Sequence, residues 1–194
     1  MFKTIYFIGL AISFIIRLYY RLRYRTNPIE ASRNKPLGIL LLFLAFIGMV
    51  VVPLTYIFTS FLNFADYPLP SWASWTGVLV FAFALWLLRR SHADLGGNWT
   101  DSLKLRKAHQ LVTSGTYKYV RHPMYAAYLL WGFGQPSLLH NWIAGWSHLV
   151  SFGMLYFYRV AREEQMMLDY FGEEYQSYIN RTGRIIPHLK RQKC

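Results

Sequence analysis

Five stretches of apolar residues, separated by polar and basic segments, set the pattern of this chain. The pattern predicts an all-α integral membrane protein whose spans need about 20 apolar residues each. The first stretch is short for a span, but the long side chains of Lys3 and Arg17 at its ends can reach the bilayer surface. Pro53 is expected to kink the second. The predicted spans cover residues 2–16, 37–62, 72–88, 124–139 and 142–158.

The last two spans are expected to form a tight helical hairpin. Residues 124–158 contain no Asp, Glu, Lys or Arg, and one straight helix of that length would overshoot the bilayer. Residues 135–137 (Gln-Pro-Ser) and 140–141 (His-Asn) are helix breakers near its middle. Helical periodicity over residues 163–178 then predicts a cytoplasmic helix that extends the fifth span and is broken near Gly172.

Composition and charge agree with a membrane protein. The chain of 194 residues is 54% hydrophobic and only 15% charged, which is too apolar for a soluble domain. A net charge of +12 could suggest nucleic acid, but Lys and Arg flank the apolar runs instead of lining one soluble face, so no nucleic-acid partner is expected. If the N-terminus lies outside, every Lys and Arg except Lys3 lies inside, which predicts cytoplasmic polar loops. The single Cys and the scattered His residues predict no metal site.

A polar, turn-rich corner precedes the fourth span, at residues 109–125 (HQLVTSGTYKYVRHPMY). Gly115 predicts a turn with positive φ. Pro123 fits the first position of a helix, where its missing N–H costs nothing. Backbone N–H groups at this helix start carry partial positive charge, so a carboxylate could dock there. In the alternative interpretation, Arg121 or His122 merely caps the helix.

A second polar cluster, Arg159-Val-Ala-Arg-Glu-Glu164, follows the last apolar run directly. Arg159 and Glu163 are spaced i, i+4, so they could form an ordinary intrahelical ion pair worth about 0.2–0.5 kcal/mol. Charges at the membrane boundary are costly, however, which favours a functional role. We expect the two clusters to face each other.

Together, the motifs identify a family. His-x-Leu-Val, Gly-x-Tyr, Arg-His-Pro-x-Tyr, an apolar hairpin and Arg-x-x-x-Glu-Glu follow one another in an order that resembles the isoprenylcysteine carboxyl methyltransferase family. Phe-Gly-Glu-Glu-Tyr at residues 171–175 also looks like that family's C-terminal helix, and the resemblance covers residues 98–187. It implies a single membrane methyltransferase domain over residues 1–194, with S-adenosylmethionine bound by the cytoplasmic regions 91–123 and 159–194.

The resemblance also assigns roles to residues. Arg159 matches the family's substrate-facing arginine and is the candidate catalytic residue, as a positioner of the acceptor carboxylate through a two-pronged contact. Lys104, Glu164 and Arg184 are candidate additional contacts. The cofactor-binding candidates are His109, Gln110, Leu111, Val112, Tyr117, His122, Pro123, Met124, Tyr125 and Glu163.

The implied chemistry suits these residue types. A carboxylate is already an anion at neutral pH, so its methylation needs no general base. The protein must hold two partners at attack distance and exclude water. The expected acceptor is a lipophilic or lipidated, isoprenylcysteine-like carboxylate that enters from the membrane lipids, past aromatic faces that include Tyr125, Tyr128, Trp131 and Phe133. The compact chain resembles prokaryotic relatives, which favours a prokaryotic plasma membrane, and no obligate protein partner is evident.

Other functions stay open. A thiol or a phospholipid amine could be the acceptor, although no base is evident for an amine. A membrane reductase that uses NADPH on a lipophilic substrate could share the Gly-x-Tyr and His-Pro-x-Tyr corner, but a carboxylate beside its pyrophosphate would be repulsive. A non-catalytic scaffold with a basic rim is a third possibility. The reductase would bind phosphates through Lys104, Arg106, Lys107, Lys118 and Arg121.

Overall fold

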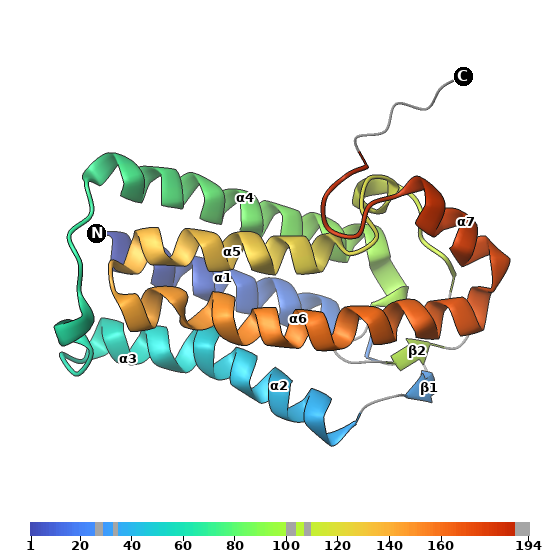
Figure 1. The fold of residues 1–194 in the computed structure, drawn as a ribbon, viewed down its shortest axis with the longest axis horizontal. Helices are drawn as coiled ribbons and strands as arrows, with labels where there is room; N and C mark the ends of the chain where they lie inside the picture. Colours follow the sequence, from blue (N-terminus) through green and yellow to red (C-terminus); the bar gives the residue numbers. More distant parts are fainter. Residues whose placement is uncertain (26–28, 33–34, 100–103, 107–109, 189–194) are drawn as a thin grey trace.

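Helices form at all five predicted apolar stretches and pack into one bundle (Figure 1). The computed structural model describes residues 1–25, 29–32, 35–99, 104–106 and 110–188. Helices α4 and α5 pack along each other, α6 packs on both α5 and α2, and α1 lies against α4 and α5. The helices are α1 (Phe2–Arg23), α2 (Pro36–Phe46), the π-helix η1 (Ile47–Val51), α3 (Val52–Phe58), α4 (Ser71–Leu95), α5 (Pro123–Leu139), α6 (Trp142–Phe171) and α7 (Glu173–Arg181), with short 3-10 turns η2 (Asn63–Ala65), η3 (Gly96–Asn98) and η4 (Gly115–Lys118).

By length and hydropathy, three helical segments of the described chain qualify as membrane spans: Phe2–Arg23, Pro36–Phe58 and Ser71–Asn98. Helix α1 continues to Arg23 instead of ending near residue 16, so Arg17 lies within the helix and not in a loop. The second segment ends at Phe58, earlier than expected. A short antiparallel ladder of β1 (Ile29–Ser32) and β2 (Lys104–Arg106) was not expected from the apolar pattern.

The expected hairpin of α5 and α6 is present, and its turn lies at residues 140–141, between the predicted spans; Pro136, also expected to break the helix, lies inside α5. Helix α5 continues through Pro136 to Leu139, and the chain reverses at His140, which adopts the left-handed conformation with φ +48°. The side chain of Asn141 then accepts hydrogen bonds from the backbone N–H groups of Ile143 and Ala144 and caps α6. Pro136 is tolerated because other groups in a packed bundle can satisfy the backbone around it.

The π-helix η1 lies immediately before Pro53, the residue expected to kink the second segment. A proline has no N–H to donate to the carbonyl four residues earlier, which here belongs to Met49. The hydroxyl of Tyr6 in α1 donates to that Met49 oxygen at 2.8 Å, and Ser147 Oγ donates to Gly48 O at 2.6 Å. Side chains of neighbouring helices therefore satisfy the carbonyls that the irregular helix releases.

A polar group at the centre of the bundle ties these helices together. The side-chain oxygen of Gln135 accepts hydrogen bonds from the Tyr6 hydroxyl at 3.0 Å and the Trp131 indole N–H at 3.2 Å. Its amide nitrogen donates to Ala144 O at 2.6 Å. Gln135 is completely buried, so each of these bonds replaces one that water would otherwise make.

Candidate active site

The polar corner before α5 is positioned by a turn at Gly115. This residue has φ +61°, and a Cβ placed there would lie 2.4 Å from the carboxylate of Asp94 at the end of α4. Asp94 accepts hydrogen bonds from the backbone N–H of Thr116 at 2.7 Å and from its hydroxyl at 2.9 Å. The positive φ expected from the sequence is therefore confirmed, and glycine is also required by the close approach of α4.

The corner is closed by the segment that follows α7. The backbone N–H groups of Arg121 and His122 donate to Gly183 O at 2.8 Å and Arg184 O at 2.9 Å, so they are not available to a ligand carboxylate. Within the described chain, no side chain caps α5, so the capping role considered for Arg121 or His122 is not found. Pro123 occupies the first helical position, as expected.

Glu164 is the centre of a buried ionic cluster behind this corner. It receives hydrogen bonds from the guanidinium groups of Arg121 at 3.0 Å and Arg184 at 2.5 Å, and His122 Nε2 lies 3.3 Å away. Burial acts to raise the pKa of Glu164, but the hydrogen bonds from His122 and Arg184 and the charge of Arg121 lower it to about 2. Arg121 also donates to the carbonyls of Ile179 in α7 and Thr182 just after it. The cluster therefore joins α6, the corner and the end of α7.

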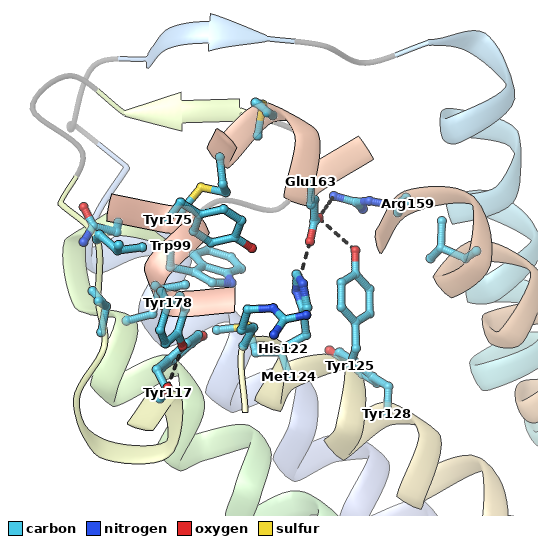
Figure 2. A pocket seen from close by; sticks show the side chains of 18 of the residues that line it. Trp99, Tyr117, His122, Met124, Tyr125, Tyr128, Arg159, Glu163, Tyr175 and Tyr178 are labelled. Carbon is cyan, nitrogen blue, oxygen red and sulfur yellow. Dashed lines mark hydrogen bonds and ion pairs between the residues drawn. The ribbon is translucent and has the colours of Figure 1, made fainter. Parts of the chain in front are cut away.

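Glu163, the neighbour of Glu164 in sequence, faces a different environment (Figure 2). Its Oε1 accepts hydrogen bonds from the Tyr125 hydroxyl at 2.8 Å and from Arg159 Nη2 at 3.1 Å. His122 Nδ1 lies 3.7 Å from the other carboxylate oxygen. The ion pair of Arg159 and Glu163 expected from their spacing is therefore present, and the two polar clusters meet as expected.

Arg159 is unusual among these groups. Its side chain is 9% exposed, whereas that of Glu163 is 23% exposed. The Arg159 Nε is buried and has no hydrogen-bond partner among the residues that the structure describes. Since an unsatisfied buried donor costs free energy, this N–H is a candidate donor to a bound ligand that carries an acceptor.

These side chains line one cavity of about 230 Å³ between the corner, the end of α6 and α7. Pro123 is buried beneath it and does not contribute to its wall, and His109 lies outside the described residues. Of the additional contacts considered, Glu164 and Arg184 lie behind the wall, and Lys104 is described only by its place in β2. The sequence-predicted residues in the wall are Gln110, Leu111, Val112, Tyr117, His122, Met124, Tyr125, Arg159 and Glu163.

The walls include aromatic and apolar residues that the motifs did not indicate. Tyr175 and Tyr178 lie on the buried face of α7, and the Tyr178 hydroxyl donates to Tyr117 O at 2.5 Å (Figure 2). Their spacing of three residues on a helix was the signal for a shared face. Asn98 holds the start of the corner through reciprocal hydrogen bonds with the backbone of Gln110. The lining residues not expected from sequence are Arg17, Leu42, Leu95, Asn98, Trp99, Phe152, Leu155, Met166, Met167, Tyr175 and Tyr178.

The expected aromatic path for an acceptor is only partly correct. Tyr125 and Tyr128 line the cavity. Trp131 is 1% exposed and belongs to the bundle core, whereas Phe133 is 59% exposed on the outside of the bundle. The apolar side of the cavity is instead formed by Leu42 of α2 with residues of α6.

Comparison with known proteins finds similarity to a family of membrane methyltransferases. A model of the isoprenylcysteine carboxyl methyltransferase family matches residues 75–169. The Homo sapiens protein-S-isoprenylcysteine O-methyltransferase is 33% identical over 122 residues, which are 62% of this chain and 43% of that protein. The Arabidopsis thaliana protein-S-isoprenylcysteine O-methyltransferase B is 28% identical over 120 residues, or 61% of each chain. This chain thus spans less than half of the human protein and about three fifths of the plant protein.

A solved structure has a similar fold. It is the structure of the eukaryotic intramembrane Ras methyltransferase ICMT (isoprenylcysteine carboxyl methyltransferase) without a monobody. The match has a TM-score of 0.56 at 24% sequence identity and covers 82% of this chain and 55% of that one. At this identity the likeness concerns the arrangement of helices alone.

Proposed function

Through residues 75–169 this chain belongs to the isoprenylcysteine carboxyl methyltransferase family, and from that premise we propose that it is a membrane-embedded, S-adenosylmethionine-dependent carboxyl O-methyltransferase. Its acceptor is the carboxylate of a lipophilic, isoprenylcysteine-like molecule. One observation carries the proposal: Tyr117, His122, Arg159 and Glu163, from distant parts of the sequence, line a single cavity where the apolar bundle meets its charged end.

The cavity suits the cofactor. When bound, S-adenosylmethionine would supply an electrophilic methyl group on its sulfonium. The Glu163 carboxylate is held by Tyr125 and Arg159 and retains acceptor capacity for hydroxyl or ammonium groups. The rings of Trp99, Tyr117 and Tyr175 provide aromatic surface for an adenine base.

Arg159 suits the acceptor. Its free Nε–H can donate to a carboxylate oxygen, while the bond from Nη2 to Glu163 fixes the plane of the guanidinium. The carboxylate loses its charge on methylation, so binding it too tightly would slow the reaction. Arg159 therefore positions the acceptor and takes no proton from it. The hydrophobic side chains of Leu42, Phe152 and Leu155 provide a wall that suits an apolar acceptor and excludes water.

We place the site on the cytoplasmic side of the membrane. The basic end of α1 and the end of α4 that carries Arg89 and Arg90 lie at the same end of the bundle as α7, while the N-terminus lies at the opposite end (Figure 1). Such an asymmetry of Lys and Arg favours a cytoplasmic location for this end. In this arrangement α1, the segment from α2 to α3, α4, α5 and the first part of α6 are the five spans of a single domain.

The reductase is less compatible with the site. Glu163 lies in the cavity wall, where a pyrophosphate would be repelled. Arg121, one of the cations considered for phosphate binding, is held by Glu164. Lys118, which was also considered for phosphate binding, lines a separate groove beside α4 and α5.

Calorimetry on the full chain in detergent tests the proposal. We expect the wild type to bind S-adenosylmethionine and its demethylated product, and Glu163→Ala to weaken both by roughly 10- to 100-fold, the value of about one hydrogen bond to a charged group. Arg159→Ala should retain cofactor binding and lose most methyl transfer from radiolabelled cofactor to an S-prenylated cysteine. Glu174→Ala, which changes an exposed carboxylate on α7, is the control. A wild type that binds NADPH but neither S-adenosylmethionine nor its demethylated product would contradict the proposal.

A further inference from the structure

The C-terminal half of α1 brings a third arginine into the cavity. Tyr6, Leu10 and Ser13 form the buried face of this helix, and Arg17 lies four residues beyond Ser13 on the same face. Arg17 is accordingly half-buried and lines the cavity. A charge that faces the interior of a membrane bundle is costly and is usually retained for a function.

Tyr128 fixes the position of this side chain. Arg17 Nη1 donates to the Tyr128 hydroxyl at 2.6 Å, and the guanidinium carbon lies 6.0 Å from the ring centroids of both Tyr128 and Trp99. On α5, Tyr128 is three residues beyond Tyr125, which holds Glu163. Residues three apart share a face of a helix, so two tyrosines on one face of α5 hold Arg17 and Glu163.

The surroundings of Arg17 favour an anionic group on an apolar molecule. Phe152 stacks against both Tyr125 and Tyr128, with ring centroids 5.9 and 5.0 Å apart, and joins the two levels of the cavity. Among the described residues of the wall, three are Arg and only Glu163 is a carboxylate. Glu164 neutralises Arg121 from behind the wall. The apolar side of the wall adjoins Tyr128, which holds Arg17.

We propose that Arg17, oriented by Tyr128, binds the acceptor's carboxylate together with Arg159 and so selects acids over neutral lipids. This inference rests on the proposed methyltransferase function. Two guanidinium groups that approach from different helices can orient a carboxylate more strictly than one. The methionyl part of the cofactor carries a carboxylate too, but the acceptor is favoured because Tyr128, which holds Arg17, packs on Phe152 of the apolar wall.

Equilibrium dialysis of the purified full chain in detergent tests this inference without turnover. The probes are N-acetyl-S-farnesylcysteine, its neutral carboxamide, and S-adenosylhomocysteine. We expect the wild type to prefer the acid to the carboxamide, and Arg17→Gln to reduce that preference by about 10- to 100-fold, as for one charged hydrogen-bonding group. Affinity for S-adenosylhomocysteine and for the carboxamide should stay unchanged.

Matched variants separate recognition from folding. Arg17→Lys keeps the charge and should retain part of the preference, and Tyr128→Phe should lower it because the hydrogen bond from Arg17 to the Tyr128 hydroxyl is lost. Arg23→Gln removes an exposed arginine of the same helix that bonds Tyr19, and should change nothing.

Three results would overturn the inference. Equal weakening of acid and carboxamide in Arg17→Gln would mean a packing role, and weakening of S-adenosylhomocysteine alone would assign Arg17 to the cofactor. An unchanged acid preference would remove Arg17 from recognition altogether. A wild type that binds neither acceptor probe would also reject it, whereas a wild type that does not bind S-adenosylhomocysteine would refute the methyltransferase proposal itself.

Discussion

Adjacent residues with the same chemistry have different roles at this site. Glu163 and Glu164 are neighbours on α6, and successive side chains on a helix point about 100° apart. Glu163 therefore faces the cavity, while Glu164 faces Arg121 and Arg184. The resemblance gave the two carboxylates different roles, but residue spacing could not explain the difference, because their partners come from the corner before α5 and the segment after α7.

The low pKa of Glu164 makes stability depend on pH. Its folded-state pKa of about 2 lies below the usual 4.5, so its contribution is complete above about pH 5 and is lost as pH falls toward 2. At about 1.4 kcal/mol per unit, the shift corresponds to roughly 3 kcal/mol. We expect Glu164→Gln to have a lower thermal midpoint than the wild type in detergent at pH 7. At pH 3 the difference between the two midpoints should be smaller. Glu174→Gln, on the exposed side of α7, is the control. A difference between wild type and Glu164→Gln that is constant across this range would argue against the ionic cluster.

At the scale of elements, local patterns identified helices better than their ends. The hairpin of α5 and α6, the break at Gly172 and the turn at Gly115 were all predicted, because a left-handed turn or a run without charges is a local property. The continuation of α1 past Arg17 was missed, since a basic residue near a membrane boundary looks like a loop until the neighbouring helices are known. The π-helix before Pro53 was missed as well, because its released carbonyls are satisfied from α1 and α6.

Gln135 is expected to be the polar residue that holds these elements together. Gln135→Leu would leave the Trp131 indole N–H without its acceptor and would remove the side-chain amide that donates to Ala144 O. Tyr6 would keep Met49 O as its acceptor. We expect a loss of about 1–3 kcal/mol, measured by unfolding in mixed detergent micelles. Gln165→Leu, at an exposed position of α6, should be nearly neutral. Equal stability of Gln135→Leu and wild type would show that the bundle does not depend on this polar group.

At the scale of the whole molecule, orientation in the membrane follows from where charge accumulates. Ser60 and Glu174 are exposed at opposite ends of the bundle, the first after α3 and the second on α7. In a Cys194→Ser background, an impermeant maleimide should label Ser60→Cys in intact cells and Glu174→Cys only after permeabilisation. The reverse pattern would place the cavity on the outer face and contradict the proposed topology.

The sequence by itself determined the helical membrane architecture, the two polar clusters and the family, because apolar periodicity, turn residues and motif order are encoded over short distances. Only the tertiary structure decided which side chains share a cavity. Arg17 joins it from α1 and Tyr175 and Tyr178 from α7, while Pro123 and Glu164, which belong to the motifs, lie behind its wall. Helix rotation and the packing of distant segments determine which side chains line the cavity. Neither can be obtained from the spacing of residues within one segment.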